Sequence, residues 1–392
     1  MKILIVHNHY QQPGGEDAVV ADEYALLKHF QEDVYLHERS NNEFQAWSTR
    51  HQLKHFLHLD YSNASYRSFS KVLDEIKPEV VHFHNTFYML TPAVYQACLD
   101  HRMPVVQSLH NFRLMCSNAL FFRNNQVCED CVSLSLWEGI RHRCYRNSFL
   151  LTAFVAKMLH RTRCKRIWQQ QIHRYITATE FTRQKYIQFG IPAEKIAVKP
   201  HFVFHDPGVD LEDSRGDFVL YAGRLSAEKG INVAIEAWEE MKSIPLKIIG
   251  DGPLSHSLRN HVQARDLPNI EFLGYVSPEE FARQMRQARC LIVPSLCYEN
   301  FPRIVVEAFS YGVPIIASRL GSLMELIEEG KTGWLFNAGD SNDLARKVEH
   351  VFRDRQQDRQ INLNCRRVYE EKYTPAQNYQ RLMSIYSSVI GF

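Results

Sequence analysis

The sequence predicts two α/β domains, each built on a parallel β-sheet, and three observations support this fold class. The chain has 392 residues, more than one ordinary hydrophobic core contains, so two domains are expected. Short runs rich in Val, Ile and Leu recur with little strict alternation, as expected of parallel strands that are buried on both faces. Helical patterns separate these runs, and this alternation is typical of βαβ units.

Nine apolar runs are the predicted strands. They are residues 2–7, 80–84, 105–109 and 175–178 in the first half, and 218–222, 246–250, 270–274, 290–294 and 314–318 in the second. Residues 16–30 and 230–241 show clear helical patterns between strands. A stretch with Pro, Gly and clustered acids at 200–217 is predicted to link the two halves.

The overall composition argues against several classes of protein. The formal net charge is only +2, which disfavours a general nucleic-acid binder. No stretch reaches the roughly 18 apolar residues that span a bilayer, and the segment MKILIVHNHY lacks the pattern of a signal peptide. Nine cysteines, an odd number scattered over a long chain, favour a reducing compartment, so we expect a cytoplasmic protein.

The residues that follow each strand are the candidate site, because ligands of doubly wound sheets bind outside the carboxyl ends of the strands. Gly14 and Gly15 follow the first strand and precede a helix that opens with Glu16. Glycines let a backbone approach a phosphate, although a tight turn explains the pair equally well. Arg224 and Lys229 follow the strand at 218–222, where two cations suit a diphosphate; solvated loop charges are the plainer alternative.

Two acids, Glu299 and Glu307, lie within the stretch SLCYENFPRIVVEAF, residues 295–309. Glu307 is expected to open a helix, where its carboxylate can accept both hydroxyls of a ribose, and Glu299 can accept sugar hydroxyls from the preceding loop. The backbone N–H groups of Asn300, Phe301 and Arg303 can meet a phosphate at the helix start. The plainer alternative is a loop acid and an acid on a solvated helix face.

The stretch PSLCYENFPRIVVEA resembles the Glu-x7-Glu signature of the retaining, nucleotide-sugar-dependent glycosyltransferases of the GT-B fold, family four. Upstream, GRLSAEKG resembles the Arg/Lys diphosphate clamp of that family, IIGDGP its mid-domain turn, and FLGYVS its base-binding loop. Near the N-terminus, PGGED resembles the glycine pair that faces the donor diphosphate, and HNF at 110–112 the His-containing loop beside the transferred sugar. The resemblance covers nearly the whole chain.

The resemblance implies two Rossmann-like doubly wound domains that face each other across a cleft. Residues 1–203 would form the acceptor-binding domain, completed by a C-terminal helix at 373–392, and residues 204–372 the nucleotide-sugar-binding domain. The implied enzyme transfers a hexose, glucose as first choice, from a UDP-sugar to a saccharide or lipid-linked saccharide in bacterial polysaccharide biosynthesis, without a catalytic metal. A regulatory or nucleotide-sugar-binding protein without turnover and a UDP-sugar epimerase stay open as alternatives.

The resemblance also implies a role for each site residue. Glu307 binds the ribose, Glu299 the transferred sugar, Arg224 and Lys229 the departing diphosphate, and His110 positions groups beside the sugar. Pro302 stands where many members have Gly, and it has no N–H to donate to a phosphate. The residues implied for donor binding are Gly14, Gly15, Glu16, Gly223, Arg224, Lys229, Gly250, Tyr275, Val276, Glu299, Asn300, Phe301, Arg303, Ile304 and Glu307.

Two further features lie outside the donor motifs. Cys116, Cys128, Cys131 and Cys144 offer four thiolates in a Cys-rich insertion at 111–146, enough for a structural zinc; ordinary free cysteines are the alternative. The acid-free stretch 139–179 predicts a basic amphipathic helix over about 147–174 that suits an anionic membrane surface at the inner face of the membrane. A lipid diphosphate acceptor or a solvated basic face explains the same charges.

Overall fold

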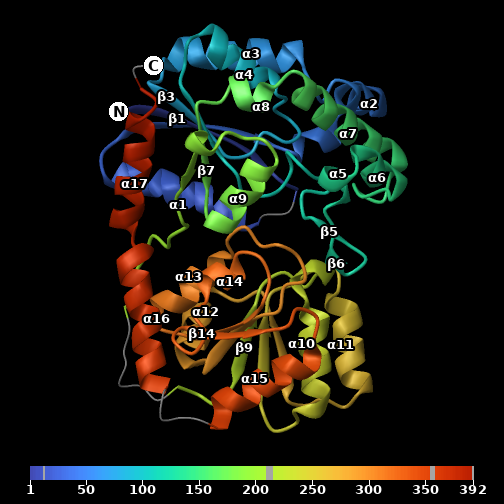
Figure 1. Cartoon of the computed structure of the whole chain (residues 1–392), viewed down its shortest axis with the longest axis vertical. Coiled ribbons are helices and arrows are strands. Elements are labelled where there is room, and N and C mark those ends of the chain that lie inside the picture. Colours follow the sequence, from blue (N-terminus) through green and yellow to red (C-terminus); the bar gives the residue numbers. More distant parts are fainter. Residues whose placement is uncertain (12–13, 209–214, 354–357, 391–392) are drawn as a thin grey trace. The chain divides into compact units, whose positions relative to one another are not determined.

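The structure is a computed structural model that describes residues 1–11, 14–208, 215–353 and 358–390. The chain divides into two compact units (Figure 1). The first unit comprises Met1–Phe121, Cys128–Phe204 and Pro375–Phe392, and the second comprises Phe122–Val127 and His205–Thr374. The middle of the predicted linker, residues 209–214, lies outside the described residues.

The first unit is built on a six-stranded sheet in the order β2-β1-β3-β4-β7-β8. All of its pairings are parallel. The strands are β1 (Lys2–His9), β2 (Asp33–Ser40), β3 (Val80–Phe83), β4 (Val105–Ser108), β7 (Arg174–Thr177) and β8 (Ile196–Val198). The longer helices are α1 (Gly15–His29), α2 (Thr49–Leu57), α3 (Asn63–Ile76), α4 (Ala93–Asp100), α7 (Phe149–Cys164), α9 (Glu180–Gln188) and α17 (Pro375–Ser387).

One face of this sheet packs against α1 and α17 (Figure 1). Alternate residues of a strand point to the same face, so Ile3 and Ile5 of β1 join Val80 of β3 in this core. Leu27 of α1 and Leu382 of α17 cover them. The C-terminal helix therefore completes the first unit, as the GT-B resemblance predicted.

The same core contains an ion pair that is almost fully buried. Lys199, directly after β8, donates from Nζ to Oε1 of Glu23 at 2.5 Å, and each side chain is only 1% exposed. Lys199 also donates to Oδ1 of Asn378 at 3.1 Å. The pair thus ties the end of β8 to α1 and to α17 inside one core.

The second unit has a six-stranded sheet in the order β11-β10-β9-β12-β13-β14, again with parallel pairings. Helix α10 packs against α15, and α13 packs against α16. The strands are β9 (Val219–Ala222), β10 (Leu246–Ile249), β11 (Ile270–Gly274), β12 (Cys290–Val293), β13 (Ile315–Ser318) and β14 (Gly333–Phe336). The helices are α10 (Ile231–Glu240), α11 (Ser255–Ala264), α12 (Pro278–Gln287), α13 (Arg303–Ser310), α14 (Leu323–Leu326), α15 (Ser341–Arg353) and α16 (Asp358–Lys372).

The Cys-rich region 111–146 contains short elements. A two-stranded antiparallel hairpin, β5 (Phe122–Arg123) with β6 (Gln126–Val127), groups with the second unit, whereas the sequence placed the whole region in the first domain. Helices α5 (Asp130–Ser133) and α6 (Leu136–Arg141) follow in the first unit.

The predicted basic helix over 147–174 is wrong in its extent and in its exposed face. Helix α7 ends at Cys164, the short helix α8 (Ile167–Gln170) follows, and Arg174 lies in β7. Phe154 and Leu159 of α7 are buried in a core with residues such as Phe56 of α2. The apolar side of the helix therefore stabilises its own unit, because the same periodicity serves a protein core as well as a membrane surface. Among the described residues, no helix has both the length and the apolar character needed to cross a bilayer.

We predict that Lys199→Ala strongly destabilises the first unit, because it leaves the Glu23 carboxylate buried without its partner. Removing one member of a buried pair costs about 3–5 kcal/mol of unfolding free energy. Differential scanning calorimetry at neutral pH measures the effect. Lys71→Ala, at an exposed position of α3, is the matched control. Equal melting temperatures for the two variants would show that the pair contributes nothing.

Candidate functional site

In the second unit, a glycine brings the loops after β9 and β12 together. Gly230 has a φ of +68°, and a Cβ at this position would lie 1.8 Å from the carbonyl oxygen of Pro294. Only glycine fits this approach, since other residues both disfavour this φ and collide with the backbone. The backbone N–H of Leu296 also donates to the carbonyl of Glu228 at 2.9 Å. The side chains on either side of these contacts are therefore held close together.

Lys229 and Glu299 meet at this junction. Nζ of Lys229 lies 2.7 Å from Oε1 and 2.9 Å from Oε2 of Glu299. The hydroxyl of Ser295 donates to Oε1 of Glu299 at 2.6 Å, and the hydroxyl of Ser322 donates to the Glu299 carbonyl at 2.6 Å. Burial works to lower the pKa of Lys229, but the Glu299 carboxylate outweighs it and raises that pKa. The structure thus joins two predicted site residues as a charged pair.

Glu307 does not open helix α13, contrary to the prediction. The helix begins at Arg303, after Pro302 at the N-cap, and Glu307 lies one turn further along. This spacing of four residues places the two side chains on one face of the helix. Nε of Arg303 donates to Oε1 of Glu307 at 3.0 Å. Asn300 and Phe301 lie buried in the loop that leads into the helix.

The other predicted residues of this unit also follow the strands. Arg224 is exposed after β9. Gly250 has a φ of +122°, and a Cβ there would lie 2.0 Å from the carbonyl oxygen of Gly223, so the exits of β9 and β10 also touch through glycine. Tyr275, which is 84% exposed, and Val276 follow β11. Ile304 lies in the first turn of α13. The predicted residues therefore gather at one edge of four neighbouring strands, β11-β10-β9-β12.

In the first unit, the face that carries the apolar core becomes rich in histidine at the carboxyl ends of its strands. Along β1, Ile3 and Ile5 are followed at the same spacing of two by His7 and His9. Along β3 the same spacing leads from Val80 to His82 and His84, and beyond β4 it leads from Val106 through Ser108 to His110. Of these histidines the sequence analysis selected His110 alone, although the spacing of two was visible in the sequence.

The rings of His82, His84 and His110 are neutral and hydrogen-bonded. Nδ1 of His84 and Nε2 of His110 lie 2.9 Å apart, and Nε2 of His82 lies 2.8 Å from the hydroxyl of Ser108. Burial lowers the pKa of His82 to about 4 and holds the pKa values of His84 and His110 well below their ordinary value. His110 is therefore an uncharged hydrogen-bonding group at neutral pH.

A small pocket opens beside this network. His110, Ser108, Lys199 and His201 are among the residues that line it. These side chains present hydroxyl, imidazole and ammonium groups, which suit a polar ligand such as a sugar hydroxyl or an oxyanion.

The glycine pair stands where helix α1 begins. Gly14 is the N-cap and Gly15 the first helical residue, both are exposed, and a Cβ at either would meet no atom within 4 Å. Burial, with a smaller contribution from Asp17, raises the pKa of Glu16 to about 8, so its carboxyl is largely protonated at neutral pH. Nδ2 of Asn111 donates to Oε2 of Glu16 at 3.4 Å. The two residues before Gly14, at 12–13, lie outside the described residues.

The four cysteines of the insertion differ in their surroundings. Cys116 and Cys131 interact directly, which lowers the pKa of Cys131 and, together with burial, raises the pKa of Cys116. Across the described residues, two groups of three side chains could hold a metal ion, and neither includes a cysteine. They are His7 with His9 and Asp17, and Glu23 with His82 and His84. The four-thiolate zinc site stays a prediction.

Comparison with known proteins gives matches along most of the chain. The family model described as Glycosyltransferase Family 4 matches residues 25–206, and that described as Glycosyl transferases group 1 matches residues 206–368. An uncharacterized glycosyltransferase of Methanocaldococcus jannaschii is 32% identical over 166 residues, which is 42% of this chain and 46% of that protein. The amylovoran biosynthesis glycosyltransferase of Erwinia amylovora is 32% identical over 176 residues, 42% of this chain and 43% of that protein.

The chain spans under half the length of these curated relatives. Solved structures resemble it over almost its full length. The Anabaena protein Alr3699/HepE, in complex with UDP-glucose, has a TM-score of 0.69 at 17% identity and covers 99% of this chain and 100% of its own. Sucrose-phosphate synthase from Thermosynechococcus elongatus has a TM-score of 0.72 at 16% identity and covers 98% of each chain. At these sequence identities, the two resemblances show a shared fold.

The family follows from three agreeing observations. Each unit is a doubly wound α/β domain with an all-parallel sheet, and the C-terminal helix α17 belongs to the first unit. The motifs that resembled the family lie at the carboxyl ends of the strands, and the two family models together match residues 25–368. The chain belongs to the GT-B glycosyltransferases of the family 4 type.

Proposed function

We propose that the protein is a retaining glycosyltransferase that moves a hexose, glucose as first choice, from a UDP-sugar to a saccharide or lipid-linked saccharide in bacterial polysaccharide biosynthesis. The contact between Lys229 and Glu299 at the edge of the second sheet carries the proposal. Two similar proteins support the proposal. The relative from Erwinia amylovora is described as a glycosyltransferase of amylovoran biosynthesis, and the Anabaena protein of the same fold is in complex with UDP-glucose.

The reaction needs no oxidant or further co-reactant. The bond from the anomeric carbon of the sugar to the diphosphate oxygen breaks, and a bond from that carbon to an acceptor hydroxyl oxygen forms on the same face. The hydroxyl proton passes to the leaving diphosphate. Negative charge grows on the diphosphate as the bond breaks, and cations placed there stabilise the transition state without a metal.

Lys229 and Glu299 together provide two binding groups for the UDP-sugar donor, an ammonium and a carboxylate. In the structure the two side chains neutralise each other, with Nζ of Lys229 2.7 Å from Oε1 of Glu299. A diphosphate offers Lys229 a stronger counter-charge, which releases the Glu299 carboxylate to accept hydrogen bonds from sugar hydroxyls. Ser295 and Ser322 keep Glu299 in place during this exchange. One ion pair thereby couples diphosphate binding to sugar binding.

A donor screen tests the proposal as a whole. Thermal-shift measurements with UDP, GDP, ADP and their sugars rank the nucleotides, because a ligand at 100 times its dissociation constant stabilises by about 2.7 kcal/mol. Slow release of UDP from the preferred UDP-sugar then separates an enzyme from a binding or regulatory protein, which binds donor without consuming it.

Lys229→Ala and Arg224→Ala are each expected to lower kcat by about 10²–10³-fold, because each removes a cation aimed at the departing diphosphate. Steady-state UDP release measures this, with Lys242→Ala, at an exposed position after α10, as the control. Circular dichroism checks that the variants fold. Wild-type rates in both site variants would refute the clamp.

Glu307→Gln should weaken UDP binding by about tenfold or more, since a hydrogen bond to a charged group contributes about 1.5–3 kcal/mol. Glu299→Gln should leave UDP affinity intact and slow sugar transfer, because its partner is the sugar. Isothermal titration with UDP compares them. Glu236→Gln, at an exposed position of α10, is the control and should bind UDP as the wild type does. Equal UDP affinity in Glu307→Gln and Glu299→Gln would contradict these separate roles.

We further propose that the protein contacts an anionic membrane through the exposed beginning of the acid-free stretch 139–179 together with Trp137, and not through the buried apolar side of α7. Three apolar side chains are exposed here: Trp137 (57%), Phe149 (51%) and Leu150 (54%). The rings of Trp137 and Phe149 pack edge to face, with their centroids 6.3 Å apart. The exposed Arg141 and Arg143 follow Trp137 in the chain. Exposed aromatic groups with cations nearby suit the headgroup region of an anionic bilayer.

Replacing Trp137 and Phe149 together by Ser should lower binding to phosphatidylglycerol vesicles by more than tenfold, because burying each apolar side chain contributes about 1.5–3 kcal/mol. UDP affinity should not change. Co-sedimentation at low and high salt measures this, with Leu99→Ser, an exposed leucine of α4, as control. If the wild-type protein does not bind these vesicles at low salt, the membrane contact is refuted.

A further inference from the structure

We propose that His7, His9 and Asp17 form a binding site for a divalent transition-metal ion, zinc being the first candidate. The site lies at the carboxyl end of β1 and the first turn of α1, within the first unit. The proposed glycosyl transfer itself needs no metal, and the site adjoins Gly14, one of the residues implied for donor binding, whose backbone N–H contacts Asp17.

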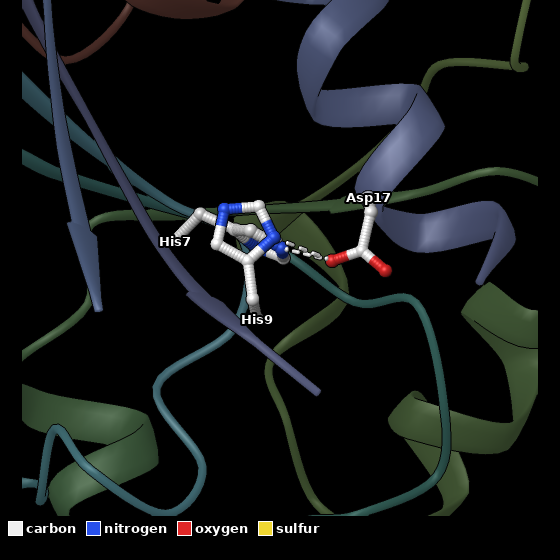
Figure 2. Close-up of side chains that lie close together, drawn as sticks. All are labelled: His7, His9 and Asp17. Atoms are coloured by element: carbon white, nitrogen blue, oxygen red, sulfur yellow. Dashed lines mark hydrogen bonds and ion pairs between the residues drawn. The ribbon is translucent and has the colours of Figure 1, made fainter. Parts of the chain in front are cut away.

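The fold itself brings the three side chains together. His7 and His9 are two positions apart on β1, so their rings lie on the same side of the sheet, the side that α1 covers. Asp17 lies in the first turn of α1, three positions before Val20, which belongs to the core between helix and strand. Figure 2 shows both imidazole rings directed at the Asp17 carboxylate.

The three ligating atoms converge on one point. Nε2 of His7 lies 2.8 Å and Nδ1 of His9 lies 2.9 Å from the same oxygen, Oδ1 of Asp17 (Figure 2). Zinc bonds of about 2.0–2.2 Å place neighbouring tetrahedral ligand atoms roughly 3.3–3.5 Å apart. To take up an ion, each imidazole nitrogen therefore needs to move only about half an ångström from Oδ1 of Asp17, and all three ligating atoms already lie within 4.8 Å of one another.

The donor set selects the class of metal. Two imidazoles and one carboxylate suit zinc, cobalt or iron(II), whereas magnesium and calcium prefer oxygen ligands alone. Three protein ligands leave at least one coordination position for water or an oxyanion. His9 is 35% exposed, which gives an ion a path to the site.

A second set of contacts orients two of the three ligands, His9 and Asp17, in advance. Nε2 of His9, the ring nitrogen that faces away from Asp17, lies 2.7 Å from Oε1 of Glu38 on β2. Metal-bound histidines typically make this contact to a carboxylate. Oδ2 of Asp17 accepts a hydrogen bond from the backbone N–H of Gly14 at 2.7 Å, which fixes the carboxylate. An ordinary surface cluster would not require both contacts.

The neighbouring group of Glu23, His82 and His84 is a poor competitor. All three side chains are buried, and the Lys199 ammonium already neutralises Glu23 at 2.5 Å. A metal ion there would meet a second buried cation. The cluster of His7, His9 and Asp17 has no comparable cation among the contacts of its three members that the structure describes.

Cobalt titration of the untagged full chain tests the proposal. We expect the weak visible bands of cobalt(II) bound by nitrogen and oxygen, at one ion per chain. His9→Gln and Asp17→Asn should each weaken cobalt binding by at least tenfold, and Glu38→Gln, outside the metal shell, by about tenfold. His58→Gln, an exposed histidine after α2, is the matched control and should bind as the wild type does.

Zinc should also raise the melting temperature of the wild type and of His58→Gln, but not of His9→Gln. Three results would overturn the site: cobalt bands that survive in His9→Gln and Asp17→Asn, only the intense charge-transfer band of thiolate ligation, or no binding at all. In the last case, lower melting temperatures of the metal-free variants would show that the cluster only ties β1 to α1.

Discussion

The close approach of Gly230 to the backbone of Pro294 is the constraint on which the site of the second unit depends. It holds the exits of β9 and β12 so near that Lys229, from one loop, bonds Glu299, from the other. A Cβ at position 230 would separate the loops and, with them, the two charges. The same kind of close backbone contact, between Gly250 and Gly223, joins the exits of β9 and β10. Backbone contacts that tolerate only glycine therefore place the charged side chains.

The first unit contains polar side chains inside a buried core. Its sheet face changes from Ile and Val to His along β1 and β3 and after β4, and burial keeps His82, His84 and His110 neutral by lowering their pKa values. Lys199 and Glu23 form the charged exception, and each is tolerated because the other neutralises it. The unit can thus offer hydrogen-bonding groups beside a pocket without leaving a charge unpaired there.

The sequence was most informative where strands are apolar and buried. All nine predicted strands exist, but β2, β8 and β14 of the two large sheets were missed, as was the short hairpin of β5 and β6: β2 carries polar residues such as Glu38 and Arg39, β8 has only three residues, and β14 begins with Gly333. Arg224, Lys229 and Glu299 lie after strands, as predicted, whereas Glu307 lies one turn into α13, and its pairing with Arg303 depends on the true start of that helix. The apolar face of α7 was assigned to a membrane because periodicity does not say what covers it.

In the proposed reaction, a sugar leaves its nucleotide with retention at the site of Lys229 and Glu299. Proton NMR of the purified protein with UDP-glucose, water serving as a slow acceptor, tests it most directly. The anomeric signal of the first glucose released reports the stereochemistry before mutarotation mixes the forms. The account predicts α-glucose together with an equal amount of UDP. Initial β-glucose, or an unchanged donor under conditions where UDP-glucose binds, would contradict it.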